Sequence, residues 1–178
     1  MKLAIVINGQ GGVGKDTLCS IAAKHYRVRN VSSITPIKEI AAACGWSGEK
    51  TDRARKFLSD LKQLTVEYND YPTRYLTEQY HDFLKGEDEI LFVHIREPQE
   101  IEKFVRASEG RAATLLVRGG KRFSHRGGAY GNTSDDGVEN YPYQYIFYND
   151  RPLGEETERH FMNYLGIIVK NAKRGRPS

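Results

Sequence analysis

The residues whose types and spacing indicate chemistry lie near the start of the chain, in the segment GQGGVGKDT from Gly9 to Thr17. A glycine, four further residues and a Gly–Lys pair form the spacing of a phosphate-binding loop. In such a loop, consecutive backbone N–H groups surround phosphate oxygens, and the lysine, here Lys15, reaches the β- and γ-phosphates. Glycine is needed because the turn uses positive φ angles and the ligand approaches the backbone closely. The pattern therefore predicts polyphosphate binding.

The position after the lysine departs from the usual pattern, because it holds Asp16 and the hydroxyl group follows one residue later at Thr17. The hydroxyl ordinarily holds Mg²⁺ beside the β- and γ-phosphates. We assign that role to Thr17 and treat the Asp16 carboxylate as a second candidate metal ligand. The residues expected to contact the nucleotide are Gly9, Gln10, Gly11, Gly12, Val13, Gly14, Lys15, Asp16 and Thr17. A glycine-rich turn that binds no ligand is the alternative.

Two elements must position this loop. Residues 2–7 form a continuously apolar run, which is typical of a parallel strand covered on both faces. Residues 17–26 are expected to form a helix, whose N-terminal dipole and unpaired N–H groups would point at the same anion. Strand, glycine turn and helix agree with one another.

Strands and helices alternate along the rest of the chain. Further strands are expected at 28–34, 90–95, 112–117 and 143–148, and further helices at 37–44, 52–68, 73–84, 98–107 and 155–170. Strands separated by helices imply right-handed crossovers between parallel strands. We therefore expect an α/β protein, with a mainly parallel five-stranded sheet between two helical layers.

Apolar residues at helical spacing are expected to face the core. In two of the helices these residues are Phe57, Leu58, Leu61, Leu64 and Tyr68, followed by Tyr75, Leu76, Tyr80 and Phe83. The two cysteines, Cys19 and Cys44, show no metal-ligand spacing, and core packing is expected for both. Thr35 is expected to cap the helix that begins near Pro36.

The composition describes a globular protein. The 178 residues are 39% hydrophobic and 28% charged, and no apolar run is long enough to span a membrane. The N-terminus leads directly into the first strand, so we expect a cytoplasmic protein without a cleaved signal. We expect one domain over residues 1–170 and a basic, disordered tail over 171–178. A net charge of +4 fits either nucleic-acid binding or polyphosphate substrates.

Several cations outside the loop are candidates for binding a second anionic group. Lys38 lies in the first turn of an expected helix, a poor place for a cation unless an anion is near. Arg53 and Arg74 begin two later helices, and a solvated side chain is the alternative for these two residues and for Lys38. The face of the long helix other than its expected apolar face carries Arg53, Arg55, Lys56 and Lys62.

Residues 119–140 form a long, glycine-rich connection. The cations at its start are Arg118, Lys121, Arg122 and Arg126, together with His125. Connections of this length inside a domain are usually functional, and a basic segment flanked by glycines suits a lid that closes over phosphates. A surface excursion without function is the alternative.

With the loop, the Lys15–Asp16–Thr17 variant and the late basic segment, the chain resembles the P-loop kinases of small phosphorylated acceptors. The likeness is to phage-type deoxynucleoside monophosphate kinases and animal-type phosphomevalonate kinase, which share a GKD loop. The matching segments are GQGGVGKDT, ITPIKEIAAACGW, HIREPQEIEKF, LLVR and DDGVENYPYQYIFYND. The glycine loop is the specific part, and the other segments contribute mainly by their order.

The resemblance implies a three-layer P-loop fold, ATP as phosphoryl donor, Mg²⁺, and a small phosphorylated acceptor such as a nucleoside monophosphate. Lys15 would span the β- and γ-phosphates, and Asp16 would position a metal-bound water or the acceptor phosphate. Arg96 falls in the arginine position of a D-x-R segment and would face the transferred group. Arg118, with Lys121, Arg122 and Arg126, would belong to the lid, and Lys38, Arg53 and Arg74 would bind the acceptor phosphate.

One departure from this family concerns His94, which stands where such kinases usually carry the aspartate that supports Mg²⁺. Neutral imidazole is a poor ligand for this hard cation. Either Asp16 or Glu97 supplies the missing carboxylate, or catalysis is weak or lost.

Two other function classes remain open. A nucleotide-binding regulatory protein without transfer activity is favoured by His94, and a kinase of another phosphorylated metabolite is a related choice. A guanine-specific NKxD segment is absent, since Asn149-Asp150-Arg151-Pro152 lacks the lysine. Nucleic-acid binding rests on the basic composition and the basic C-terminal tail, and it is disfavoured. We expect no membrane association, and a homodimer is left open.

Overall fold

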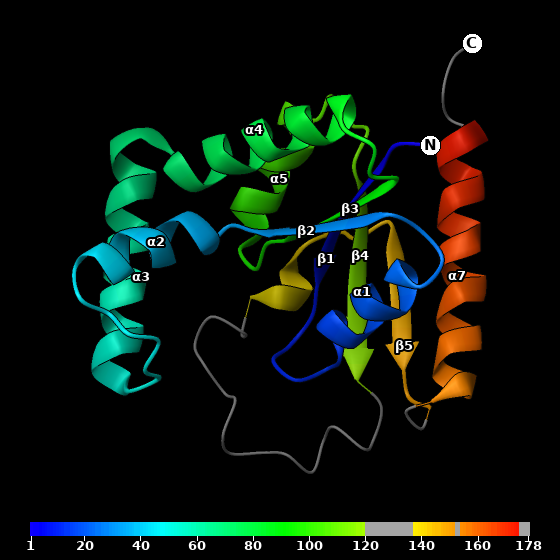
Figure 1. Cartoon of the computed structure of the whole chain (residues 1–178), viewed down its shortest axis with the longest axis horizontal. Helices are drawn as coiled ribbons and strands as arrows, with labels where there is room; N and C mark the ends of the chain where they lie inside the picture. The colour runs from blue at the N-terminus through cyan, green and yellow to red at the C-terminus, as the bar shows by residue number, and fades with distance from the viewer. Residues whose placement is uncertain (120–136, 152–153, 175–178) are drawn as a thin grey trace.

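A sheet of five parallel strands lies at the centre of the computed structural model, which describes residues 1–119, 137–151 and 154–174 (Figure 1). The strand order is β2-β3-β1-β4-β5, and each neighbouring pair is parallel. The strands are β1 (Leu3–Asn8), β2 (Val28–Ser32), β3 (Ile90–His94), β4 (Ala113–Gly119) and β5 (Tyr145–Asn149). The expected α/β fold with a five-stranded sheet is therefore confirmed.

Helices connect and cover the strands. They are α1 (Lys15–Ala23), α2 (Thr35–Ala43), α3 (Asp52–Asn69), α4 (Tyr71–Lys85), α5 (Pro98–Ala107) and α7 (Glu155–Arg174), with a 3₁₀ turn, η2 (Val138–Asn140). Figure 1 shows α7 at one side of the molecule and α2 and α3 at the other. No helix in the described residues is long and apolar enough to cross a membrane.

The central strand β1 is buried along its whole length. Leu3, Ile5 and Ile7 belong to the apolar cluster that contains side chains of α1 and α7, whereas Ala4 and Val6 belong to the cluster that contains side chains of α4 and α5. Successive side chains of a strand point to opposite faces. A strand covered on both faces needs the uninterrupted apolar run that its sequence shows.

The register places the ends of three strands beside one another. Ile7 of β1 pairs with His94 of β3 on one side and with Leu115 of β4 on the other. Because the strands are parallel, the segments that follow β1 and β3 leave the sheet at the same edge, where ligands bind in open α/β sheets. The glycine loop and Arg96 emerge together at that edge.

The prediction that α3 faces the core with Phe57, Leu64 and Tyr68 is wrong. These side chains are 37%, 62% and 87% exposed, and Ala54 is the buried residue of this helix. The reason is that α3 packs against α2 and α4 rather than lying across the sheet. Its buried side is narrow, and of the five predicted core residues only Leu58 and Leu61 are half-buried.

Other expectations need smaller corrections. Cys19 is buried as expected, but Cys44 is exposed, because it follows the last turn of α2. Thr35 is the first residue of α2 rather than its cap. Helix α7 continues to Arg174, so residues 171–174 of the expected disordered tail are helical.

The expected lid segment is only partly within the described residues. Gly119 ends β4, and Val138 in η2 is 1% exposed, so the segment's C-terminal end is anchored in the fold. Residues 120–136, with Lys121, Arg122, His125 and Arg126, lie outside the described residues. Their proposed closure over phosphates remains a prediction.

Candidate functional site

A cavity of about 830 Å³ opens at the carboxyl edge of the sheet. Its walls come from the glycine loop with the start of α1, the junction of β2 and α2, the middle of α3, and the junction of β3 and α5. The predicted site residues that line it are Gly11, Gly12, Lys15, Asp16, Lys38 and Arg96. Segments far apart in the sequence therefore meet in one polar cavity.

Glycine is required at both ends of the loop. Gly9 has a φ of 149°, and a Cβ there would lie 2.4 Å from the backbone oxygen of Val117. Gly14 has a φ of 93°, and its Cβ would lie 2.6 Å from Asn149 Nδ2. That amide donates a 2.8 Å hydrogen bond to the Val13 carbonyl. Close contacts to β4 and to the end of β5 thus fix the path of the loop.

Lys15 lies at the first turn of α1, where the helix dipole favours an anion. Its ammonium group donates hydrogen bonds to the carbonyl oxygens of Gly9, at 2.5 Å, and Gln10, at 2.9 Å. The side chain is therefore folded back over the loop. Phosphate oxygens would offer stronger acceptors at the same place, because they carry negative charge.

Asn8 joins the loop to two neighbouring segments and was not singled out by the sequence analysis. It is 1% exposed, and its Oδ1 accepts a 2.8 Å hydrogen bond from the Gly9 N–H group. Its Nδ2 donates to the Arg96 carbonyl at 3.0 Å and to the Tyr143 hydroxyl at 2.7 Å. Its position as a polar residue at the end of an apolar strand could have indicated this role from the sequence. One side chain thereby ties the loop to the segment that carries Arg96.

Asp16 acts electrostatically on His94, which is half-buried and lines the cavity, and on the buried Cys19. Burial lowers the pKa of His94, while Asp16 opposes this shift and Lys15 adds to it. Burial, followed by Asp16, raises the pKa of Cys19 to about 12. His94 Nε2 lies 3.3 Å from Asn30 Oδ1, which only accepts hydrogen bonds. His94 is therefore a neutral side chain near the site, and Asp16 is the nearby carboxylate.

The other predicted cations separate into two groups. Lys38 and Arg96 line the cavity, whereas Arg53 and Arg74 are exposed and are not among its lining residues. The part of α3 that faces the cavity instead contributes Arg55, Lys56 and Lys62 among its lining residues. Helical spacing could have linked Arg55 to Lys62, seven residues later, but only the fold shows which side faces the loop.

Arg118, expected in the lid, is held beside the end of β4. Its guanidinium donates two hydrogen bonds of 3.1 Å and a shorter one to the Glu139 carboxylate, and a 3.0 Å bond to the Tyr148 hydroxyl. These hydrogen bonds, Glu139 first, raise the pKa of Arg118. Any contact of Arg118 with a bound nucleotide would have to compete with this pairing.

An ion-pair cluster, Lys62–Glu97–Glu100, joins α3 to the start of α5; Lys62 and Glu100 are largely buried, and Glu97 is partly exposed. Lys62 Nζ lies 2.7 Å from Glu97 Oε2 and 3.1 Å from Glu100 Oε2. Burial, then repulsion from Glu97, raises the pKa of Glu100 to about 7 against the attraction of Lys62. Burial opposes ionisation of Glu97 as well, but its ion pair with Lys62 prevails and lowers its pKa. The cluster therefore holds one firmly ionised carboxylate at the cavity wall.

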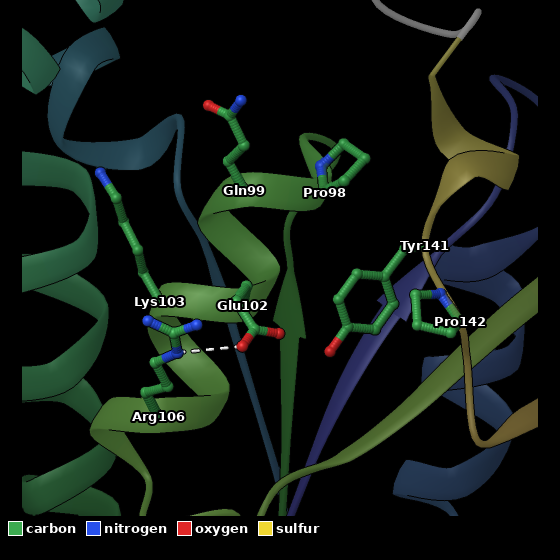
Figure 2. A pocket seen from close by; sticks show the side chains of 7 residues that line it. All are labelled: Pro98, Gln99, Glu102, Lys103, Arg106, Tyr141 and Pro142. Carbon is green, nitrogen blue, oxygen red and sulfur yellow. Dashed lines mark hydrogen bonds and ion pairs between the residues drawn. The ribbon is translucent and has the colours of Figure 1, made fainter.

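A second hollow of about 480 Å³ lies between α5 and the segment Tyr141–Pro142 (Figure 2). Its three charged residues are already paired: Arg106 with Glu102 at 2.9 Å, and Lys103 with Asp70 at 2.9 Å. Neither the glycine loop nor any predicted site residue lines it. We therefore place the candidate site in the larger cavity.

Comparison with known proteins identifies the fold. No known protein-family profile and no curated protein sequence matches the chain. Solved structures do: a sugar kinase from Janibacter sp. HTCC2649 (15% identity, TM-score 0.57, covering 95% of each chain) and a gluconokinase from Sinorhizobium meliloti 1021 (16%, 0.54, 98% of each). A shikimate kinase from Bacteroides thetaiotaomicron is similar at 16% identity and a TM-score of 0.55, over 94% of this chain and 98% of that one.

The chain thus shares the fold of these three solved structures. At these identities the likeness concerns the fold and leaves the acceptor undefined. The finer resemblance to deoxynucleoside monophosphate kinases or phosphomevalonate kinase stays a prediction.

Proposed function

We propose that this protein is an ATP-dependent kinase that transfers the γ-phosphoryl group to a small acceptor that itself carries a phosphate, such as a nucleoside monophosphate. The observation that carries the proposal is the continuity of the cavity, which joins the glycine loop to a wall bearing Lys38, Arg55 and Arg96. One end suits the phosphates of the donor. The cationic wall suits a second anion beside it.

Phosphoryl transfer needs alignment and neutralisation of charge more than covalent chemistry. The loop N–H groups and the N-terminus of α1 would hold the donor phosphates. Lys15 would leave the carbonyl oxygens of Gly9 and Gln10 and bind the β- and γ-phosphates. Arg96, whose backbone is fixed by Asn8, would face the group in transfer.

The residues beside the loop fit a magnesium ion. Mg²⁺ is usually bound by one or two carboxylates together with substrate phosphates and water. Asp16 and Thr17 are exposed at the start of α1, so their oxygens are accessible, and neutral His94 adds no repelling charge. No group of three or more acidic, histidine or cysteine side chains that could hold a metal alone is found in the described residues. The ion would neutralise part of the donor phosphate charge.

A second candidate function is nucleotide binding without transfer, as in a regulatory protein. His94 at the end of β3, in the position where the resembled kinases carry an aspartate, favours it. This alternative predicts tight ATP binding that no acceptor changes.

A screen of phosphorylated acceptors with ATP and Mg²⁺, scored by ADP release, tests the proposal. We expect acceptor-dependent ADP release that falls at least 100-fold in Lys15→Met, because the lysine acts on the transferring phosphate. Lys24→Met is the matched control, since Lys24 lies at the far end of α1 and pairs with Glu158. ATP binding without acceptor-dependent release would favour the regulatory alternative.

A further inference from the structure

Glu97 stands at the start of α5, directly after Arg96. It occupies the N-cap position, and its side chain makes no capping hydrogen bond. Helices are usually capped by the shorter side chains of Ser, Thr, Asp or Asn, so the longer Glu97 side chain is not used as a cap. Here Glu97 lines the cavity, and its carboxylate is directed to Lys62 on α3.

Lys62 holds this carboxylate mainly by charge. Its side chain is 13% exposed, and its ammonium group lies at ion-pair distance from both Glu97 and Glu100. The Oε2 atoms of Glu97 and Glu100 are buried and have no partner with hydrogen-bond geometry among the described residues. The Glu97 side chain as a whole is 43% exposed and lines the cavity. Because Oε2 is buried against Lys62, the other carboxylate oxygen is the one that would accept a hydrogen bond from a ligand.

Two other carboxylates line the cavity. Asp60 pairs with Lys56 at 2.6 Å, and Asp16 lies beside the glycine loop. An anionic group of the acceptor would be repelled by Glu97 and attracted to Lys38 and Arg96. What suits Glu97 is a neutral donor on the acceptor, such as a hydroxyl group.

We propose that Glu97, oriented by Lys62, is a specificity-determining residue that accepts a hydrogen bond from a hydroxyl group on the body of the phosphorylated acceptor. This inference rests on the proposed function for the presence of the acceptor. It narrows the substrate class to hydroxyl-bearing phosphates, such as those with a sugar. Glu100 contacts Lys62 from the protein interior and would not contact the acceptor.

The test uses one nucleoside 5′-monophosphate in its ribo, 2′-deoxy and 2′,3′-dideoxy forms. Calorimetry measures binding of each to the full chain in the presence of a non-hydrolysable ATP analogue. We expect the dideoxy form to bind about 10-fold or more weakly than the best hydroxyl-bearing form, because a hydrogen bond to a charged group is lost. In Glu97→Ala this ratio should shrink to within about 2-fold.

Two further variants separate specificity from structure. Lys62→Arg should keep most of the discrimination, while Lys62→Met should lose most of it, because the carboxylate loses its orienting charge. Glu102→Ala, on the same helix but outside the cavity, is the matched control and should leave the ratio unchanged. A merely structural role of Glu97 would weaken all three ligands equally.

The outcomes distinguish the inference from the proposed function. Discrimination that Glu97→Ala abolishes, without any ADP release in the kinase assay, would support the inference and overturn the kinase proposal. ADP release with an unchanged ratio in Glu97→Ala would overturn the inference alone. Failure of all three forms to bind would overturn the inference for this acceptor class.

Discussion

Replacing Glu100 by glutamine should make the protein more stable at alkaline pH. Glu100 is 8% exposed, and its carboxyl group shares Lys62 with Glu97. Glutamine has the same shape, can accept a hydrogen bond from Lys62 and can donate one to Glu97, as the protonated acid does. Glu100→Gln therefore imitates the protonated side chain at every pH.

The size of the effect follows from the pKa of Glu100, which burial and the neighbouring Glu97 raise from 4.5 to about 7. The stability that this raised pKa contributes is fully present below about pH 4.5 and is lost as the pH rises to about 7. At about 1.4 kcal/mol per pKa unit, the loss is at most about 3 kcal/mol. Because the side chain is not completely buried, we expect about 1–2 kcal/mol.

Urea unfolding followed by circular dichroism measures the free energy of unfolding at several pH values. Wild type and Glu100→Gln should be nearly equal near pH 4, and the variant should be about 1–2 kcal/mol more stable near pH 8. Glu102→Gln is the control, since this carboxylate pairs with Arg106 near the surface. A Glu100→Gln variant that is less stable than wild type near pH 8 would refute the reasoning, because Glu100 would then be an ionised partner of Lys62.

Two further predictions concern the loop and the cysteines. Gly14→Ala should lower the free energy of unfolding by about 2–4 kcal/mol, because its Cβ would meet the buried Asn149 amide. Gly12→Ala has a φ of 80° but no atom near its Cβ, and it should cost only about 1 kcal/mol. Thermal unfolding measures both losses, and equal losses would contradict the contact. At about pH 8 a thiol reagent should modify the exposed Cys44 rapidly and leave Cys19 unmodified. Burial raises the pKa of the Cys19 thiol to about 12, so its reactive thiolate is scarce. Two fast-reacting thiols in the folded chain would contradict this arrangement.

The parts of the fold that the sequence predicted are those with local signals. The apolar run of β1, the glycine loop and the start of α1 are each specified by neighbouring residues, and all appear where expected within a few positions. The alternation of strands and helices was enough to predict a parallel sheet. Local patterns could not show which side of α3 would be buried, because that depends on its packing against α2 and α4.

The candidate site was predictable only where its residues are close in sequence. The loop with Lys15 and Asp16 is such a segment. The cluster joins Lys62 to Glu97 and Glu100, which lie more than thirty positions later in the sequence. Nothing in the sequence of α3 or α5 indicates that these residues would meet. Arg53 and Arg55 are equally basic, and only the position of α3 shows that Arg55 lines the cavity.

At His94, the residue expected from the sequence resemblance differs from the residue that the structure has. The resemblance expects a carboxylate at the end of β3, yet burial keeps His94 neutral there. Asp16, one residue after the loop lysine, is close enough to shift the pKa values of both His94 and Cys19. A negative charge is thus present near the end of β3, but it comes from α1. A search for a carboxylate at a fixed strand position would therefore miss Asp16, because only the fold shows that it lies near the end of β3.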